Sequence, residues 1–271
     1  MIRFDDQGSG PPIVLLPGLA ATSRVFDGTV RDLSRDHRVI TLELPGHGDR
    51  TDPADDTPAT VSGAAGALHT LLDRLGVTEA TLLGWSLGAT VAYAYLERFG
   101  RKHVRALVSV DQSPRLVLDR DWPHAAFGAL DEDGARDLAR GVTADFAAFT
   151  ANLVGGSFAA GTEPAAEAHG LLVSEALRCD PVAVRSLLAD VTGQDWRERL
   201  PLVTSSLPTL FVHGARSRVY PTALGRWLGD TLPSARLEVF DSSGHLPFLE
   251  EPERFLRTVR AFTAHDKEPT P

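Results

Sequence analysis

Sulfur is nearly absent from this sequence, whose 271 residues include one cysteine and one methionine. A single cysteine, Cys179, excludes an internal disulfide framework and is typical of a reducing compartment. We expect its side chain to be buried as a small apolar group. The chain also lacks any apolar run near the ~18 residues that span a bilayer, and residues 1–6 form no apolar signal core. These absences predict a cytoplasmic protein without a membrane span.

Basic runs and metal-ligand spacings are absent as well. Lysine and arginine total 27 against 36 acidic residues, for a net charge of −9. Sequence-independent binding of nucleic acid needs clustered basic residues, so nucleic acid is not an expected partner. The histidines show no H-E-x-x-H or comparable spacing, and one cysteine cannot build a thiolate site. Gly8-Ser9-Gly10 is too short to cradle a phosphate. We therefore expect no metal and no cofactor.

Short apolar runs alternate with helical patterns along most of the chain. Strands are expected at residues 13–16, 38–42, 80–83, 106–110, 209–213 and 236–240. Helices are expected at 23–34 (with Ser23 as its cap), 64–75, 87–99, 221–232 and 252–265. This alternation predicts an α/β fold, with a mostly parallel, doubly wound sheet and helices on both faces.

One long stretch interrupts the alternation. Residues 115–207 contain helical patterns at about 132–140, 143–154, 163–178 and 181–191, without a convincing strand. We interpret this stretch as a helical cap inserted into a core formed by residues 1–114 and 208–265. The polar residues 51–58 are expected to be flexible. The charged, proline-ended residues 266–271 are expected to be a disordered tail.

The sequence Gly84-Trp85-Ser86-Leu87-Gly88 lies between an apolar strand and a helix of small residues. It matches G-x-S-x-G, the nucleophile elbow. A strand that turns at once into a helix strains the turn residue and crowds the positions two residues to either side, where only glycine fits. The turn lifts the Ser86 hydroxyl to the N-terminus of the helix, whose unpaired N–H groups suit an oxyanion.

Reactive and hydrogen-bonding groups follow the carboxyl ends of several expected strands. They are Pro17-Gly18-Leu19, Ser86, Asp111, Ser217 and His245. In open parallel sheets these strand ends lie along one edge, and ligands bind there. The convergence predicts one functional site at that edge.

From Ile13 to His265 the chain resembles the α/β-hydrolase fold family. The resemblance is carried by Pro17-Gly18-Leu19, Pro45-Gly46-His47-Gly48, the elbow, and Gly244-His245 ahead of a Glu-Pro helix start. It implies that Ser86 is the nucleophile and that His245, last in chain order, is the base. The fold hosts many chemistries, so the resemblance does not assign the substrate.

The other histidines are interpreted mainly as structural. His213 ends a strand beside Gly214 and is expected to be a packed core histidine, and His47 is expected to shape its loop. His124, in the cap, is a candidate substrate contact. Five histidines lie in helical or surface stretches and are expected to be solvated: His37, His69, His103, His169 and His265.

The acid of the triad departs from the pattern of the family. The family usually places Asp in a G-x-x-D spacing after the strand 210–213, but here Ser217 occupies that position. Either the triad is degraded or the acid has moved. Asp111 is the candidate, because certain haloalkane dehalogenases and cofactor-independent dioxygenases look similar, with their acid after the same strand. It would orient His245 and stabilise its charged form; the alternative role is that of a turn-forming residue.

The oxyanion hole is expected to use the backbone N–H groups of Leu19 and Leu87, with Gly18 allowing close approach of the backbone. Apolar residues of the cap favour a hydrophobic acyl or aromatic substrate over a sugar or a peptide. The candidate substrate contacts are Gly18, Trp85, Trp122, His124, Phe127, Phe146 and Phe149, and Leu153 and Phe158 are further candidates for the pocket wall.

These residues predict a serine hydrolase that cleaves an ester, lactone or thioester of a hydrophobic small molecule through an acyl-enzyme. Three alternatives stay open. The acyl-enzyme could end in cyclisation or acyl transfer. The pair of His245 and Asp111 could act as a base for C–C cleavage or cofactor-independent oxygenation, with Ser86 only positioning the substrate. The fold could also serve as a non-catalytic small-molecule receptor. Serine at the nucleophile position argues against a dehalogenase, which requires a carboxylate there.

Overall fold

A single mixed sheet organises the computed structural model, which describes residues 2–48 and 56–265. The expected disordered tail and most of the expected flexible loop lie outside these described residues. The strand order is β1-β3-β2-β4-β5-β6-β7. β1 pairs antiparallel with β3, and the other neighbours pair in parallel. The strands are β1 (Phe4–Gly8), β2 (Pro12–Leu16), β3 (Arg38–Leu42), β4 (Ala80–Trp85), β5 (Val104–Val110), β6 (Thr209–Gly214) and β7 (Arg236–Phe240).

Strand β2 illustrates why the central strands are continuous apolar runs. Ile13 and Leu15 face one apolar core, and Val14 and Leu16 face the other. All four side chains are buried, because successive side chains of a strand point to opposite faces and both faces are covered by helices. The predicted α/β class and doubly wound sheet are therefore confirmed.

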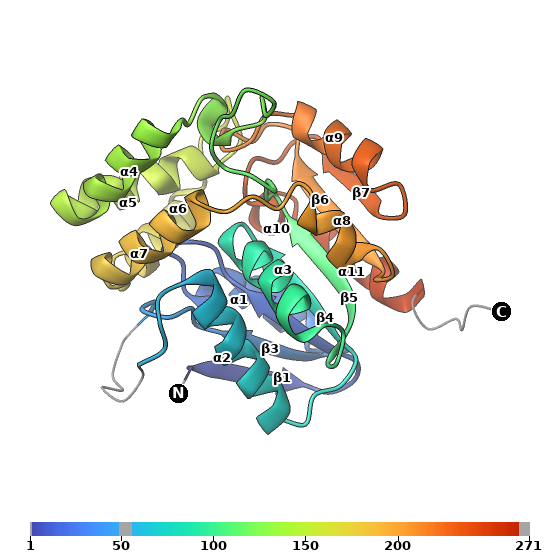
Figure 1. Cartoon of the computed structure of the whole chain (residues 1–271). Coiled ribbons are helices and arrows are strands. Elements are labelled where there is room, and N and C mark those ends of the chain that lie inside the picture. Colours follow the sequence, from blue (N-terminus) through green and yellow to red (C-terminus); the bar gives the residue numbers. More distant parts are fainter. Residues whose placement is uncertain (1, 49–55, 266–271) are drawn as a thin grey trace.

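Helices cover both faces of this sheet (Figure 1). One face packs against α2 (Val61–Arg74), α3 (Leu87–Phe99), α8 (Arg199–Thr204) and α9 (Ala223–Thr231). The other packs against the 3₁₀ turn η1 (Ser23–Phe26), α1 (Asp27–Leu33), α10 (Pro247–Glu250) and α11 (Pro252–His265). In the described part of the chain, no helix is long and apolar enough to cross a membrane.

The inserted stretch forms a group of helices at one end of the sheet (Figure 1). They are η2 (Ala126–Gly128), α4 (Glu132–Ala144), α5 (Phe146–Ser157), α6 (Ala166–Ala176) and α7 (Pro181–Thr192). Their apolar side chains form a separate small core that includes Cys179, which is buried as expected. Burial raises the pKa of the Cys179 thiol to about 12, so this thiol is inert.

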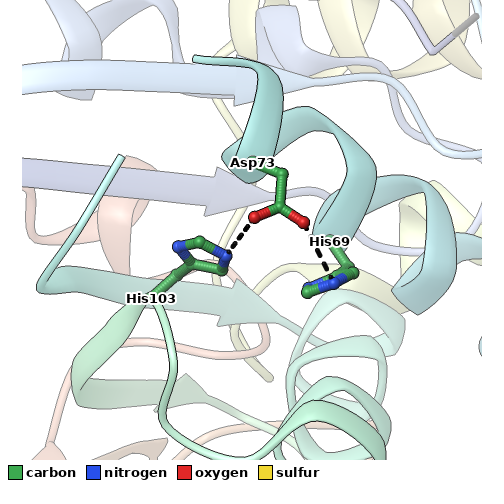
Figure 2. Close-up of side chains that lie close together, drawn as sticks. All are labelled: His69, Asp73 and His103. Atoms are coloured by element: carbon green, nitrogen blue, oxygen red, sulfur yellow. Dashed lines mark hydrogen bonds and ion pairs between the residues drawn. The ribbon is translucent and has the colours of Figure 1, made fainter. Parts of the chain in front are cut away.

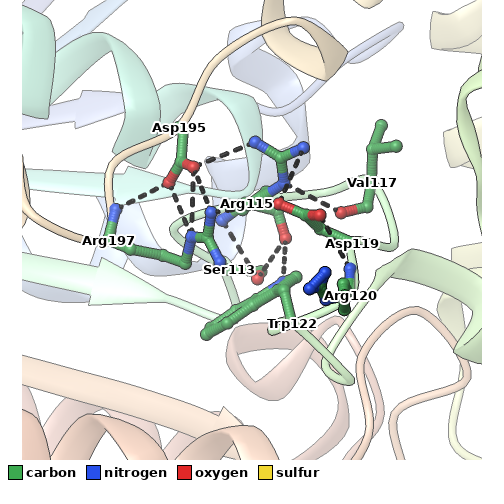
Figure 3. Close-up of polar contacts among 8 residues, drawn as sticks. All are labelled: Ser113, Arg115, Val117, Asp119, Arg120, Trp122, Asp195 and Arg197. Atoms are coloured by element: carbon green, nitrogen blue, oxygen red, sulfur yellow. Dashed lines mark hydrogen bonds and ion pairs between the residues drawn. The ribbon is translucent and has the colours of Figure 1, made fainter.

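The two segments that connect the cap to the core are tied together by charged side chains (Figure 3). Arg115 donates to Asp195 at 2.9 Å, and Arg197 donates to both Asp195 at 2.6 Å and Asp119 at 3.3 Å. The indole N–H of Trp122 donates to the backbone oxygen of Arg115 at 2.8 Å. The hydrogen bond from Arg197 is the main cause that lowers the pKa of Asp195 to about 2. This network stays ionised at neutral pH and holds the base of the cap.

Several elements differ from the sequence prediction. Ser23 does not cap a long helix, since its N–H and hydroxyl groups contact the Glu43 carboxylate and a 3₁₀ turn precedes α1. Strand β1 escaped prediction because its sequence, FDDQG, is mostly polar. Helices α8 and α10 were also missed, since each has six residues or fewer. Within the inserted stretch, α8 packs on α3, where Leu200 joins the core and Arg199 pairs with Glu97 at 2.6 Å.

Candidate active site

Ser86 occupies a strained turn between β4 and α3. Its φ is 52° and its ψ is −124°, a conformation that side-chain-bearing residues rarely adopt. A Cβ atom added at Gly84 would lie 2.5 Å from the backbone of Ala89, and one at Gly88 would lie 2.1 Å from the backbone oxygen of Leu16. The structure thus supports the steric explanation of the elbow glycines.

Three of the five non-glycine residues with positive φ in the described part of the chain lie at this edge of the sheet. Ala20, Ser86 and Asp111 have φ values of 53°, 52° and 42°, and they follow the carboxyl ends of β2, β4 and β5. Such strain costs about 1–3 kcal/mol per residue and persists where surrounding structure imposes it, often at functional sites. Three strained residues from separate strands therefore mark one candidate site.

The carboxylate of Asp111 is fully buried and surrounded by donor groups. Its Oδ2 atom lies 2.7 Å from Nδ1 of His245 and accepts a hydrogen bond from the Ser217 hydroxyl at 2.8 Å. Its Oδ1 atom accepts from the N–H of Gly214 at 3.2 Å and lies 2.7 Å from Nδ1 of His213. Burial by itself raises the pKa of Asp111, but the contacts with His213 and His245 outweigh it and hold the pKa well below its usual range.

Ser217, in the position where the family usually has its acid, contacts the carboxylate of Asp111. Its Oγ atom accepts from the N–H groups of Val219 and Tyr220 at 3.2 and 3.3 Å. The hydroxyl hydrogen is then directed to Asp111. The structure therefore brings Asp111, His245 and Ser217 together at the carboxyl ends of β5 and β6.

The loop that carries His245 is held from both sides. The N–H of His245 donates to the backbone oxygen of Ser157, at the end of cap helix α5, at 2.9 Å. The Trp85 indole donates to the backbone oxygen of His245 at 2.8 Å. Glu250 accepts from the N–H groups of Gly244 and Ala159, each at 2.7 Å. The position of this histidine thus depends on contacts with the cap, and sequence reasoning missed the part played by Glu250.

Ser86 and His245 line a common cavity of about 40 Å³. Its other described lining residues are Leu19, Ala20, Ala21, Trp85, Leu153, Val154, Ser157 and Leu172. The loop of Leu19 passes close to the nucleophile, because a Cβ atom on Gly18 would lie 3.3 Å from Cβ of Ser86. Leu87 begins α3, so its N–H belongs to the first turn, whose amides have no partner within the helix. Both predicted oxyanion donors thus border Ser86.

His47 holds the loop that carries Leu19. Its Nδ1–H donates to the backbone oxygen of Pro45 at 3.2 Å, which leaves Nε2 to accept from the N–H of Ala20 at 2.9 Å. Burial lowers the pKa of His47 to about 4, so the imidazole is neutral at pH 7 and can accept this hydrogen bond. These two hydrogen bonds support the expectation that His47 shapes its loop, and they connect that loop to the loop of Leu19.

The other candidate substrate contacts lie in different places. Phe149 and Leu153 line a second, apolar cavity of about 350 Å³ between α4, α5 and α7, and Phe146 stacks on Phe149. Trp122 is buried at the base of the cap, with His124 against its ring edge. Phe127, at 48% exposure, lies at the surface. The described lining of the cavity at Ser86 does not include Trp122, His124 or Phe127.

Sequence reasoning recognised His213 as a core histidine but missed its contact with Asp111. It also placed His37 and His103 among solvated residues, whereas their exposures are 6% and 5%. The sequence signal that could have identified this contact is the position of His213, directly before the G-x-x-S segment of residues 214–217. His37 and His103 precede strands by one residue, and their burial comes from packing against distant helices.

A family model described as the alpha/beta hydrolase fold matches residues 11–252. The chain belongs to this family. Two similar proteins are pimeloyl-[acyl-carrier protein] methyl ester esterases. That of Nitrosomonas europaea is 33% identical over 258 residues, covering 94% of this chain and 96% of the relative. That of Chromobacterium violaceum is 31% identical over 253 residues, covering 93% and 94%.

Solved structures extend the likeness. An esterase from Exiguobacterium antarcticum superposes with a TM-score of 0.87 at 25% identity, covering 96% of this chain and 94% of that one. A bromoperoxidase from Bacillus anthracis shares the fold, with a TM-score of 0.87 at 24% identity and coverages of 97% and 95%. Together with the family match, these relatives identify the protein as a carboxylic ester hydrolase of the α/β hydrolase family.

The position of the acid can be tested by exchange. We expect Asp111→Asn to lower kcat by about 10⁴-fold, because the amide cannot stabilise the charged imidazole or enforce its tautomer. Restoring the usual position in the double variant Asp111→Asn/Ser217→Asp should recover about tenfold or more of that loss, since both side chains approach the same region. Steady-state kinetics on a chromogenic ester would measure both effects. Asp241→Asn, an exposed acid beside β7, is the control, and near-normal activity of Asp111→Asn would contradict the prediction.

His47 should make stability depend on pH. The unfolded chain binds a proton at this residue near pH 6.5, but the folded chain does so only near pH 4. Unfolded molecules therefore bind more protons between these values, and stability falls as the pH is lowered from 6.5 toward 4, by about 3 kcal/mol at most. Urea unfolding at pH 7 and pH 5 should show a smaller fall for His47→Gln than for the wild type. His169→Gln should behave like the wild type; equal falls in all three proteins would refute the assignment.

Proposed function

We propose that the protein hydrolyses a small-alcohol ester, a methyl ester above all, of an acyl chain, through an acyl-enzyme on Ser86. The observation that carries the proposal is the contact of His245 with the buried Asp111 carboxylate at a cavity that Ser86 also lines. The Nδ1–H of His245 donates to Asp111, which leaves Nε2 free to accept a proton.

The reaction follows from these groups. His245 takes the hydroxyl proton of Ser86 as its oxygen attacks the ester carbonyl. The N–H groups of Leu19 and Leu87 stabilise the resulting oxyanion, each such donor being worth about 3 kcal/mol. His245 then gives the proton to the departing alcohol. Water, activated by the same histidine, releases the acid and regenerates Ser86.

The two cavities support a division of the substrate. The cavity of about 40 Å³ at Ser86 has room for only a few atoms, since one water molecule needs roughly 10–15 Å³. The apolar cavity of about 350 Å³ shares Leu19 and Leu153 with it. We assign the small cavity to the alcohol portion of the ester and the larger one to the acyl chain. Apolar walls favour the methylene groups of that chain.

A carrier-bound substrate is supported by a separate feature of the cap. A hollow of about 560 Å³ between α4 and α7 is lined by Arg115, Arg136, Arg140 and Arg185, together with Glu132. Arg136 and Arg140 pair with the exposed Asp133 and Asp137 on the same helix. Exposed pairs of this kind are weak, so these arginines can exchange them for a negatively charged partner. The named substrate of the relatives is a pimeloyl-[acyl-carrier protein] methyl ester. We therefore propose this ester, or one closely similar, as the substrate.

The nucleophile is tested by removing it. We expect Ser86→Ala to lose several orders of magnitude of esterase activity, and intact-mass spectrometry should find one fluorophosphonate adduct on the wild type and none on the variant. Assays of carrier-bound and free methyl pimelate side by side would test whether the enzyme recognises the carrier protein. A mild effect of Ser86→Ala would favour base chemistry by His245 and Asp111 instead. Binding without turnover across an ester panel would favour a receptor.

The assignment of the acyl cavity makes a second prediction. Ala148→Phe should fill part of the 350 Å³ cavity that Ala148 lines, and should lower kcat/KM for long-chain methyl esters by about tenfold or more while sparing methyl acetate. Ala147→Phe is the control, because Ala147 is an exposed neighbour on the same helix outside the described lining of that cavity. Equal effects on short and long acyl chains would count against this assignment.

A further inference from the structure

Two histidines and an aspartate meet at the end of the sheet opposite the active site (Figure 2). His69 and Asp73 are one helical turn apart near the end of α2, and His103 directly precedes β5. Nε2 of His69 lies 3.2 Å from one carboxylate oxygen of Asp73, and Nε2 of His103 lies 3.0 Å from the other. One ligand atom from each of the three residues lies within 4.8 Å of the others.

The hydrogen bonding of His103 determines which of its nitrogens faces the carboxylate as an acceptor. Nδ1 of His103 lies 2.7 Å from the backbone oxygen of Val77. A carbonyl oxygen only accepts, so Nδ1 carries the proton. In neutral imidazole, Nε2 then presents a lone pair to the anionic oxygen of Asp73. This arrangement calls for a cation between the two atoms, either a proton or a metal ion. A backbone carbonyl that orients the far nitrogen of a histidine is also the usual support of a metal ligand.

His69 is held in place by its surroundings. Its ring stacks on Phe99 with centroids 4.0 Å apart and planes inclined by 4°, and its Nδ1 atom is buried without a hydrogen-bond partner among the described residues. The ring of His69 is thus fixed with Nε2 toward the carboxylate of Asp73.

We propose that His69, Asp73 and His103 form a binding site for a divalent transition-metal ion, with Zn²⁺ as the best-suited ion. Imidazole nitrogen and carboxylate oxygen are zinc ligands at about 2.0–2.2 Å, and adjacent ligands of a tetrahedral ion are then roughly 3.3 Å apart. The two nitrogen–oxygen separations, 3.2 and 3.0 Å, are close to that value and involve different oxygen atoms of Asp73. To hold one ion, the carboxylate would therefore bind through both oxygens or turn one of them toward both rings. Water would complete the coordination on the exposed side of Asp73.

Lys102 competes with the metal for the carboxylate. Its ammonium group lies 2.7 Å from the Asp73 oxygen that faces His103, and its side chain is 57% exposed. Arg98 is a second nearby positive charge. A bound ion would displace Lys102 into solvent at little cost, because exposed ion pairs contribute little to stability. The competition provides a sharp test, since removing Lys102 should strengthen binding of metal.

Metal bound at this site would join α2 to the segment between α3 and β5. Its ligands come from the amino-terminal side of the sheet, whereas Ser86 and His245 lie at the carboxyl end. The ion would therefore act on stability, and the rate of ester hydrolysis would not depend on it. Ligand binding confined to the folded state raises the free energy of unfolding by mass action.

The test uses chelator-treated, full-length protein titrated with ZnCl₂ in thermal unfolding and with CoCl₂ in visible absorption, where tetrahedral Co²⁺ gives intense bands. At a Zn²⁺ concentration about a hundredfold above Kd, we expect Tm to rise by about 5 °C or more. Asp73→Asn, which preserves the shape of an exposed side chain, should weaken Co²⁺ binding by about tenfold or more. Lys102→Ala should bind more tightly than the wild type.

His169→Ala, which removes a partly exposed histidine on cap helix α6, is the matched control and should bind like the wild type. His69→Ala should lose the Co²⁺ bands while keeping ester hydrolysis. The proposal fails if the wild type shows neither the Tm rise nor the bands. It also fails if Asp73→Asn binds as tightly as His169→Ala, since the ions would then occupy other sites.

Discussion

The active site depends on the buried carboxylate of Asp111. A carboxylate without solvent is tolerated only when its oxygen atoms are satisfied by donors or positive charge. Here β6 supplies the N–H of Gly214 and the ring of His213, the loop after β6 supplies Ser217, and His245 completes the set. The carboxylate must reach donors on the neighbouring strand β6 and on the loop of His245. This need accounts for the strained backbone of Asp111 and for the position of His245.

With Asp111 proposed as the acid, the residue in the usual position of the acid has a different role. Ser217 cannot offset a charged imidazole, but its hydroxyl donates to Asp111 while the following backbone amides donate to the hydroxyl. His213 approaches the other carboxylate oxygen. The end of β6 therefore contributes to the candidate site without carrying an acid, because its residues hold the carboxylate of Asp111. Adjacent parallel strands make this exchange possible, since Val110 and Val212 are paired in register.

The cap and the opposite end of the sheet add two further constraints. The entry and exit segments of the cap are joined by the contacts of Arg115 with Asp195 and of Arg197 with Asp119. At the other end, the cluster around Asp73 gathers two histidines where α2 meets the start of β5. The proposed catalytic residues and the proposed metal site thus lie at opposite ends of one sheet. This is expected, because the core between them is apolar and polar functional groups lie in the segments that connect strands and helices.

The sequence by itself determined the features that depend on local patterns. Apolar runs specified the central strands, and Gly84 and Gly88 identified the elbow, because a strand that turns into a helix excludes side chains there. The sequence also singled out Asp111 as the candidate acid, since Ser217 broke a fixed spacing and Asp111 followed a buried strand, and the structure brings Asp111 to His245. Only the tertiary structure decided the rest. The contacts of His213 and Glu250 and the meeting of His69 with His103 join segments far apart in the chain. No local pattern encodes such distances, because they arise from the packing of helices onto both faces of the sheet.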